Sequence, residues 1–304
     1  MTLFVAELCV NHLGSLNLAM KMIEVAAEIG CDFVKLHRKD VDSFYTTEKL
    51  AQPYDSPFGY SWGEYRRMFE FSEDDFRRID AKCDEVGIGW FATAQDLASL
   101  EFLVQFDLPL YKIASCNARN EDLVRAVAEM TDPDAPIVLS VGGSTLNEIG
   151  HALSWLEGRY VYLLHCVAEY PCHDSRLRLG NISVLKGLFE DDKIKVGFSS
   201  HEVGTKATYA ALNMGIAMLE RHFALSRHSF VHGIECAIEP DEYTQVMARY
   251  RLAAVLELDK YAEGLPREAM ESSFGMSDLE HDFLVDQKYG IKFIPDKAHF
   301  DGQR

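Results

Sequence analysis

Short apolar runs alternate with amphipathic stretches along almost the whole chain, and this alternation restricts the fold more than any other feature. Each run is hydrophobic over most of its length, which is typical of parallel strands buried on both faces. The eight runs are Leu3–Val10, Phe33–His37, Gly89–Ala94, Leu110–Ser115, Pro136–Val141, Tyr160–Cys166, Lys195–Ser200 and Ala217–Phe223. The stretches between them have helical spacing, and in the first of these Ser15 predicts an N-cap and Gly30 a C-terminal stop.

Eight strands separated by helices predict a (β/α)8 TIM barrel. The first and eighth runs reach Glu7 and His222, which are 215 residues apart, so seven repeats average about 31 residues. This length fits a barrel of about 250 residues. An open doubly wound sheet is the alternative, although no Gly-x-Gly-x-x-Gly fingerprint follows the first run. We expect a catalytic barrel over residues 1–263 and a short C-terminal extension over 264–304, packed on the barrel or on a partner subunit. The insertion Val41–Glu70, after the second strand, is expected to shape the site.

The charge balance and the cysteines exclude several classes of protein. Among 304 residues, 48 are acidic and 30 are Lys or Arg, so the net charge of −18 repels nucleic acid. The seven cysteines are scattered and form no Cys-x-x-Cys, which indicates reduced thiols and a cytoplasmic location. The first twelve residues lack the basic segment of a signal peptide, and no apolar run approaches the ~20 residues of a membrane span.

Polar residues at the strand ends point to a site, because barrel chemistry occurs at the carboxyl ends of the strands. Lys35 and Lys112 each lie within an apolar run, and a buried ammonium needs an anion. That anion could be a carboxylate of the chain, from Glu7 or Glu220, or a bound phosphate or carboxylate. Hydroxyl groups at neighbouring strand ends favour a bound anion, and they belong to Thr93, Ser115, Ser140 and Ser199.

Two histidines end neighbouring strands of the predicted barrel. His201 and His222 could chelate one divalent ion and leave positions open for a substrate. The alternative is a pair of hydrogen-bonded core histidines without a metal. Glu7 also has two interpretations, since it could form a salt bridge to Lys35 or act as a general acid or base.

Several segments together resemble the sialic acid synthase family, which comprises N-acetylneuraminate synthases and their legionaminate and pseudaminate relatives. They include AELCVNHLGSLNLA, GCDFVKLH, LYKIASC, YLLHCVAEYP, VGFSSHEVG and LERHFAL, in the family's order between residue 5 and about residue 245. The resemblance implies a (β/α)8 barrel that condenses phosphoenolpyruvate with the open-chain aldehyde of an acylated aminosugar. It also implies a divalent metal, manganese or magnesium, and a homodimer.

Individual residues match the motifs of this family. The resemblance implies that Glu7 is the acid/base residue and that Tyr170 lies beside the acceptor as a second catalytic residue. It assigns the phosphoenolpyruvate site to Lys35, Thr93, Lys112, Ser115, Ser140 and Ser199, and the metal to His201 and His222. On the acceptor side, His37 and Asn117 replace a Gln and a Glu of the family pattern.

Other positions depart from the family. Ala168 replaces an Asn that helps hold the carboxylate end of phosphoenolpyruvate, and Gly233 replaces an acceptor-binding Asp. The extension over 264–304 is too short for the family's C-terminal antifreeze-like (SAF) domain. We therefore predict a phosphoenolpyruvate-dependent transferase that forms a C–C bond with a different aldehyde and gives a 2-keto acid and phosphate. The alternatives are a metal-dependent aldolase or lyase of a keto acid or sugar phosphate, and a non-catalytic homologue.

Overall fold

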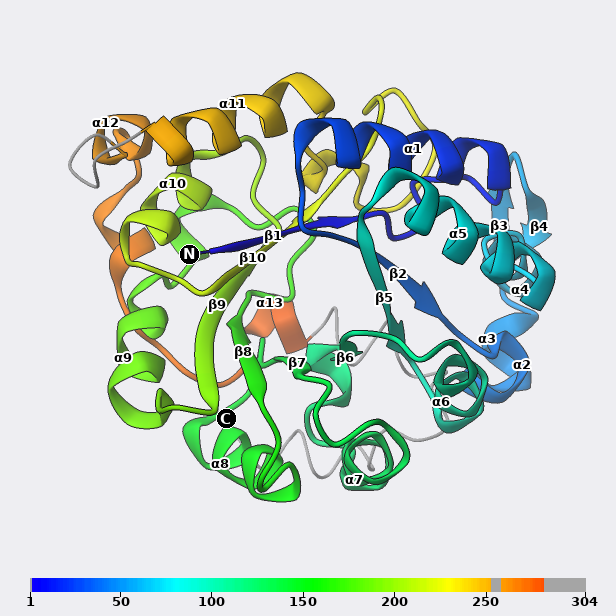
Figure 1. Ribbon diagram of the computed structural model, residues 1–304, viewed down its shortest axis with the longest axis horizontal. Coiled ribbons are helices and arrows are strands. Elements are labelled where there is room, and N and C mark those ends of the chain that lie inside the picture. Colours follow the sequence, from blue (N-terminus) through cyan, green and yellow to red (C-terminus); the bar gives the residue numbers. More distant parts are fainter. Residues whose placement is uncertain (1, 253–257, 282–304) are drawn as a thin grey trace.

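The computed structural model describes residues 2–252 and 258–281, and its centre is a closed parallel barrel (Figure 1). The strand order around the barrel is β1-β10-β9-β8-β7-β6-β5-β2. The barrel strands are β1 (Leu3–Glu7), β2 (Phe33–Arg38), β5 (Gly89–Ala94), β6 (Tyr111–Ile113), β7 (Ile137–Ser140), β8 (Val161–His165), β9 (Ile194–Ser200) and β10 (Met218–His222). The predicted (β/α)8 barrel is confirmed, and the open sheet is excluded because β1 pairs with β10.

The predicted strands are found at their expected places, with ends that differ by a few residues. The largest difference is in β1, which ends at Glu7, where the apolar run continues to Val10. The chain turns after Glu7, and Cys9 and Leu13 both adopt positive φ angles, of 47° and 55°. This turn brings the residues after Glu7 across the carboxyl end of the barrel.

Helices on the outside of the barrel connect its strands. In α1 (Leu16–Ile29), the Ser15 side chain accepts the Leu18 N–H, and Gly30 ends the helix at a φ of 89°, so both predicted caps are confirmed. The other helices of the barrel are α5 (Glu73–Val86), α6 (Leu97–Leu103), α7 (Glu121–Met130), α8 (Leu146–Trp155), α9 (Gly180–Phe189), α10 (Lys206–Asn213) and α11 (Pro240–Leu252). Short 3-10 helices are η1 (Val104–Phe106), η2 (Ser115–Asn117), η3 (Asp174–Arg176), η4 (Ile234–Cys236) and η6 (Arg267–Met270).

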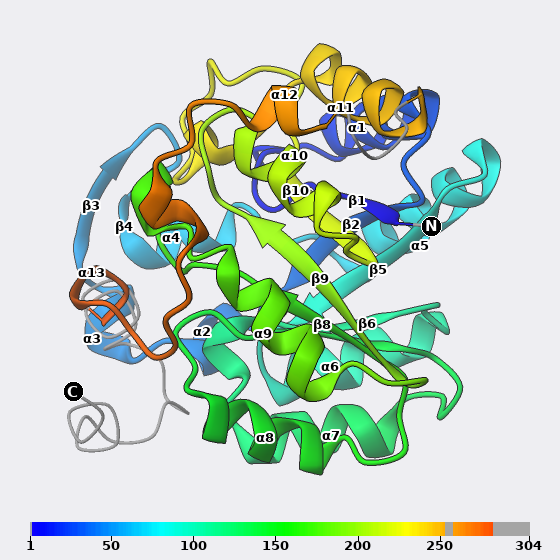
Figure 2. The ribbon, with the colours of Figure 1, turned by 90° about the vertical axis from the view of Figure 1, so that its left-hand side faces the viewer.

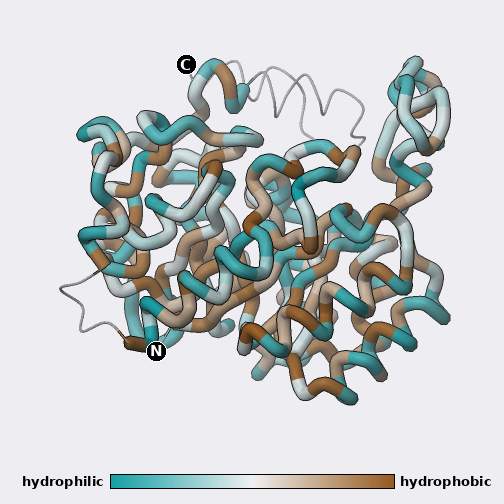
Figure 3. The backbone as a smooth tube through the Cα atoms, turned by 90° about the horizontal axis from the view of Figure 1, so that it is seen from above, coloured by the Kyte–Doolittle hydropathy of each residue, from teal (hydrophilic) through white to brown (hydrophobic). Residues whose placement is uncertain are grey.

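Burial on both faces explains why the strands are apolar throughout. Val5, Phe91, Leu164 and Met218 belong to a cluster that fills the interior of the barrel. Strand residues that alternate with these, such as Phe4 beside Val5, face the helices. They belong to the larger core, which also contains the inner faces of the helices. In Figure 3, brown hydrophobic stretches run through the body of the molecule, and teal gathers on its outer turns. No helix of the described residues has the length and apolar character needed to cross a membrane.

The insertion after β2 is folded, and it contains a hairpin that the sequence did not predict. It comprises α2 (Val41–Phe44), α3 (Thr47–Leu50), the antiparallel strands β3 (Pro53–Ser56) and β4 (Gly59–Ser61), and α4 (Trp62–Arg67). Tyr65 of α4 is fully buried and packs in a cluster with Val10 and Val231, from the loops after β1 and β10. Figure 2 shows the insertion at the end of the barrel toward which the strand arrows point.

Helix α12 (Asp259–Ala262) precedes the C-terminal extension, and the described part of the extension contains η6 and α13 (Asp278–His281), while residues 282–304 lie outside the described residues. Glu280 of α13 is fully buried, and its Oε1 accepts the Ala168 N–H at 3.1 Å. Its Oε2 pairs with Arg178 at 3.1 Å. The described part of the extension therefore packs on the barrel beside the end of β8, at the same end as the insertion.

Candidate active site

A cavity of about 220 Å³ opens at the carboxyl ends of the barrel strands. The predicted site residues that line it are Glu7, Lys35, His37, Thr93, Lys112, Ser115, Ser140, Tyr170, Ser199, His201 and His222. Asn117 is the exception, because it is fully buried in η2 and its Nδ2 donates to the Gln95 carbonyl at 3.2 Å. The barrel thus gathers into one cavity residues that are up to 215 positions apart in the sequence.

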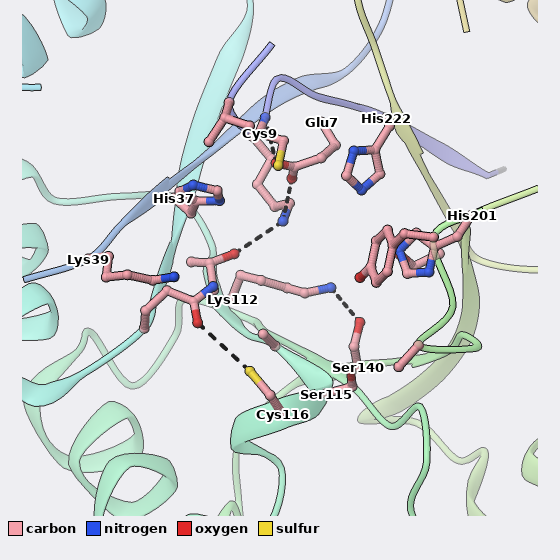
Figure 4. A pocket seen from close by; sticks show the side chains of 18 of the residues that line it. Glu7, Cys9, His37, Lys39, Lys112, Ser115, Cys116, Ser140, His201 and His222 are labelled. Atoms are coloured by element: carbon pink, nitrogen blue, oxygen red, sulfur yellow. Dashed lines mark hydrogen bonds and ion pairs between the residues drawn. The ribbon is translucent and has the colours of Figure 1, made fainter. Parts of the chain in front are cut away.

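Lys112 forms the centre of the inner, charged part of the cavity. Its Nζ donates to Ser140 Oγ at 2.6 Å and to Glu220 Oε2 at 3.1 Å (Figure 4 shows the contact with Ser140). Ser199 Oγ donates to the other oxygen of Glu220 at 2.8 Å. Burial alone would raise the pKa of Glu220, but the ammonium groups of Lys112 and Lys35 hold that pKa at about 2. Glu220 is therefore a buried carboxylate anion.

Lys35 lies beside this group and contacts both carboxylates. It forms an ion pair with Glu7, donates to Thr93 Oγ1 at 3.1 Å and lies 3.6 Å from Glu220. Burial lowers the pKa of Lys35 to about 8, against the opposing effect of Glu220. Glu7 Oε1 also accepts the Cys9 N–H at 2.7 Å, which fixes the orientation of this carboxylate. The sequence allowed either a carboxylate of the chain or a bound anion as the partner of these lysines. The structure shows that Glu7 and Glu220 of the chain contact them.

His201 and His222 face each other with ring centroids 5.4 Å apart. The His201 Nδ1 lies 2.6 Å from the Val167 carbonyl oxygen, and because a carbonyl only accepts, Nδ1 carries the proton and Nε2 keeps a free lone pair. Burial lowers the pKa of His201 to about 4 and that of His222 well below its ordinary value, so both rings are neutral. A neutral imidazole offers a lone pair to a divalent ion, and a metal-binding histidine usually donates its other ring N–H to a carbonyl or carboxylate, as His201 does to Val167.

Glu7, Cys9 and His37 form a second group with metal-ligand chemistry. Their ligand atoms all lie within 4.8 Å of one another. However, Glu7 is already paired with Lys35, and burial raises the pKa of the Cys9 thiol, which disfavours the thiolate that binds metals. His201 and His222 therefore fit a divalent ion better than this group does.

Tyr170 lines the cavity beside His201, and Gly233 lies next to the Tyr170 ring. The Tyr170 ring centroid lies 3.9 Å from that of His201, and burial raises the pKa of this phenol well above its ordinary value. Gly233 adopts a φ of 77°, and a Cβ at this position would lie 3.6 Å from the Tyr170 ring. An Asp at position 233 would therefore be strained in this backbone, and Gly233 leaves the space beside Tyr170 open.

Residues of the insertion, which sequence reasoning did not assign to the site, also line the cavity. They include Tyr45, Trp62 and Arg66, and Lys39, which precedes the insertion, lines the cavity as well. The sequence did contain a signal for Arg66, because the Tyr-Arg-Arg segment of α4 places Arg66 directly after Tyr65. Both Tyr65 and Arg66 are buried in the structure. The structure thus adds two basic side chains to those found at the strand ends.

Comparison with known proteins assigns this chain to a family. Residues 22–259 match the NeuB family. The chain belongs to the NeuB family. Two NeuB relatives are an N-acetylneuraminate-9-phosphate synthase of Drosophila melanogaster, 32% identical over 83% of this chain and 68% of the relative, and an N,N'-diacetyllegionaminic acid synthase of Campylobacter jejuni, 30% identical over 82% and 75%. These NeuB relatives are synthases, and the chain is an enzyme of their class.

A solved structure supports the fold of this NeuB chain. A spore coat polysaccharide biosynthesis protein of Bacillus subtilis superposes with a TM-score of 0.74 over 92% of this chain and 75% of the other. The two sequences are 24% identical, so this likeness concerns the barrel architecture alone.

Proposed function

We propose that the chain condenses phosphoenolpyruvate with an aldehyde and produces phosphate and a 2-keto acid that is three carbons longer. The observation that carries the proposal is the cluster of Lys35, Lys112 and hydroxyl groups at adjacent strand ends of a NeuB-family barrel. Phosphoenolpyruvate has a phosphate and a carboxylate, and such a cluster offers cations and hydroxyl donors for both.

The inner cavity supplies the groups that would hold phosphoenolpyruvate. Lys112 donates to Ser140 Oγ and Lys35 donates to Thr93 Oγ1, so each hydroxyl oxygen accepts from an ammonium and keeps its own O–H to donate to a ligand. The remaining hydroxyl groups proposed for this ligand belong to Ser115 and Ser199. Because these groups are fixed before the ligand arrives, they stabilise the charge of the departing phosphate with little reorganisation.

The reaction forms one C–C bond and, from water, one C–O bond at carbon 2, and it breaks the C–O bond between carbon 2 and the phosphate. Carbon 3 of phosphoenolpyruvate attacks the aldehyde carbon, and the aldehyde oxygen becomes a hydroxyl group. Water adds at carbon 2 while Glu7 accepts its proton, and the resulting hemiketal expels phosphate to leave the keto group. A divalent ion, manganese or magnesium, held by His201 and His222 would polarise the aldehyde oxygen when bound.

The acceptor side supports a different aldehyde from that of the sialic acid synthases. Gly233 has no side chain to accept the hydroxyl groups of a sugar, and Asn117 faces the Gln95 carbonyl instead of the cavity. A buried sugar hydroxyl without a partner costs about 1–3 kcal/mol. We therefore propose that N-acetylmannosamine itself is a poor acceptor.

A screen of aldehydes tests the proposed function. Purified protein with manganese or magnesium is incubated with phosphoenolpyruvate and a panel of aldoses, and inorganic phosphate is measured. Phosphate release that requires both phosphoenolpyruvate and an aldehyde, and that is lost in Lys112→Met, is the expected result. Cleavage of a keto acid or sugar phosphate without any phosphoenolpyruvate turnover would instead support an aldolase or lyase.

A further inference from the structure

One peptide group in the loop after β8 connects the histidine pair to the C-terminal extension. This group joins Val167 to Ala168. Its carbonyl oxygen accepts from His201 Nδ1 at 2.6 Å, and its N–H donates to Glu280 Oε1 at 3.1 Å. Because the C=O and the N–H of a planar trans peptide point in opposite directions, the histidine and the glutamate lie on opposite sides of it. An unbroken chain of two hydrogen bonds therefore joins the two side chains.

The contact with the Val167 carbonyl decides how the His201 ring is held. The main chain of His201 is fixed separately, because this residue directly follows β9 and its carbonyl oxygen accepts the Cys172 N–H at 2.8 Å. A fixed main chain still lets an imidazole ring turn over about its last side-chain bond. The hydrogen bond from Nδ1 prevents this, and it keeps the proton away from Nε2. Figure 4 shows the ring on the same side of the cavity as His222.

Glu280 is itself firmly placed on the other side of the peptide group. The residue is fully buried, its Oε2 accepts the Ser277 N–H at 3.0 Å, and the same oxygen pairs with Arg178 at 3.1 Å. Its Oε1 is directed to the Ala168 N–H. A carboxylate is a stronger acceptor than a neutral group, and a peptide whose N–H is bonded to one is polarised, so its carbonyl oxygen accepts more strongly as well.

The loop offers the peptide group no regular secondary structure to hold it. Residues 166–169 belong to neither a helix nor a strand, and Ala168 is 1% exposed. Without Glu280, the Ala168 N–H would be a buried donor without an acceptor, which is unfavourable. The peptide group could then rotate to find another partner, and the rotation would turn the Val167 carbonyl away from His201. The orientation of this carbonyl therefore depends on a residue of the extension.

We propose that Glu280 is a positioning residue for His201. It fixes the peptide group of Val167 and Ala168, and the carbonyl of that group keeps His201 in the form with Nδ1 protonated and Nε2 unprotonated. This inference rests on the proposed function, in which a divalent ion takes the lone pair of Nε2. Outer hydrogen-bond partners commonly fix the rings of metal-binding histidines. The C-terminal extension thus acts on the active site through one hydrogen-bonded peptide group.

The protonation form of the His201 ring tests the proposal without any metal. Metal-free protein is labelled with ¹⁵N in its histidines, and long-range ¹H–¹⁵N spectra show which ring nitrogen carries the proton; the signals are assigned with His201→Gln. The wild type should show one form, with the proton on Nδ1. Glu280→Ala should show a mixture of both forms. A His201 spectrum that is the same in Glu280→Ala and in the wild type would overturn the inference.

Calorimetry with manganese alone measures the consequence for metal binding. Manganese affinity should fall about 10-fold in Glu280→Ala, at the lower end of the effect of such outer partners, because Glu280 acts through a peptide group. Glu280→Gln keeps an acceptor oxygen without the charge, so it should retain the Nδ1 proton and lose less affinity. This variant also allows the test if Glu280→Ala does not fold. Wild-type affinity in both variants would contradict the proposal.

Ser277→Ala is a matched control from the same segment. Ser277 Oγ donates to Glu169 Oε1 at 3.3 Å and accepts the Glu280 N–H at 3.1 Å. The substitution removes a contact between the extension and the same loop, but it leaves Glu280 Oε1 on Ala168. It should lower the free energy of unfolding and change neither the His201 spectrum nor the manganese affinity. Equal losses of affinity in Ser277→Ala and Glu280→Ala would show that the extension acts by general packing, which overturns the role of Glu280.

Failure of the proposed function gives a different result from failure of this inference. A wild type that binds no manganese would refute the proposed metal, and the spectra of the metal-free protein would still decide whether Glu280 positions His201. A wild type that binds manganese with the same affinity as both Glu280 variants would refute the positioning role alone.

Discussion

Replacing Lys112 by Met should lower both the stability of the fold and the affinity for phosphoenolpyruvate, for two separable reasons. The ammonium is 2% exposed and contacts Ser140 and Glu220, so its loss leaves a buried carboxylate with Ser199 and the more distant Lys35. Removing one partner of a buried ion pair lowers the free energy of unfolding by about 3–5 kcal/mol. The pKa of Glu220, about 2 against an ordinary 4.5, gives a similar figure of about 3 kcal/mol for its stabilisation by all its partners.

The pH dependence and a double variant distinguish the two reasons. A lowered carboxyl pKa stabilises the fold above pH 4.5, and this stabilisation is lost as the pH falls through about 2. The stability difference between wild type and Lys112→Met, from urea unfolding followed by tryptophan fluorescence, should therefore shrink below pH 4.5. Lys112→Met combined with Glu220→Gln should recover most of the stability at pH 7, because no charge is left unpaired.

Calorimetry then decides the role of the lysine. Phosphoenolpyruvate affinity should be about 10- to 150-fold weaker in the single variant and should stay weak in the double variant, because a neutral pair offers no cation to the phosphate. Wild-type affinity in either protein would refute the reasoning. In that case Lys112 would be only the structural partner of Glu220.

Three further predictions concern the metal, the response to acid and the C-terminal extension. His222→Ala should abolish manganese binding in calorimetry while Cys9→Ser keeps it, and the reverse result would move the metal to the group of Glu7. Burial lowers the pKa of His165 to about 4, so its contribution of about 3 kcal/mol is present above pH 6.5 and lost as the pH falls toward 4; His165→Gln should therefore show a shallower loss of urea stability over this range, and an unchanged slope would contradict the assignment. Glu280→Ala should cost about 3 kcal/mol and speed hydrogen exchange in residues 271–281, whereas unchanged protection would show that this carboxylate does not hold the extension.

The barrel was predictable because its signals are local in the sequence. A parallel strand buried on both faces is apolar over its whole length, so a run such as Gly89–Ala94 shows in the sequence without knowledge of its neighbours. The caps of α1 were predictable for the same reason, since Ser15 contacts a backbone N–H only three residues away. A strand end also identifies the residues beside the cavity, and all the predicted site residues except Asn117 line it.

Features that depend on distant contacts were not predictable in this way. The partner of Lys112 is 108 residues further along, and only the closed barrel selects Glu220 over the other carboxylates. The hairpin of β3 and β4 is short and only half-buried, so its sequence has no run of alternating hydrophobic residues. Arg66 and Arg67 are equivalent in the sequence, and the packing of Tyr65 against the loops after β1 and β10 decides which of them faces the cavity.

The pairing of β1 with β10 has a consequence for the synthesis of the chain on the ribosome. Leu3 pairs with Met218 and Glu7 with His222. Strand β1 therefore cannot pair with β10, its second neighbour beside β2, until more than two thirds of the polypeptide has been made. Until then the nascent sheet has two open edges, which are sites for aggregation. A chain arrested before residue 218 would also lack Glu220, so Lys35 and Lys112 would have no shared carboxylate. Fragments that end before β10 should therefore be poorly soluble, and the catalytic cavity should form only in the last stage of folding.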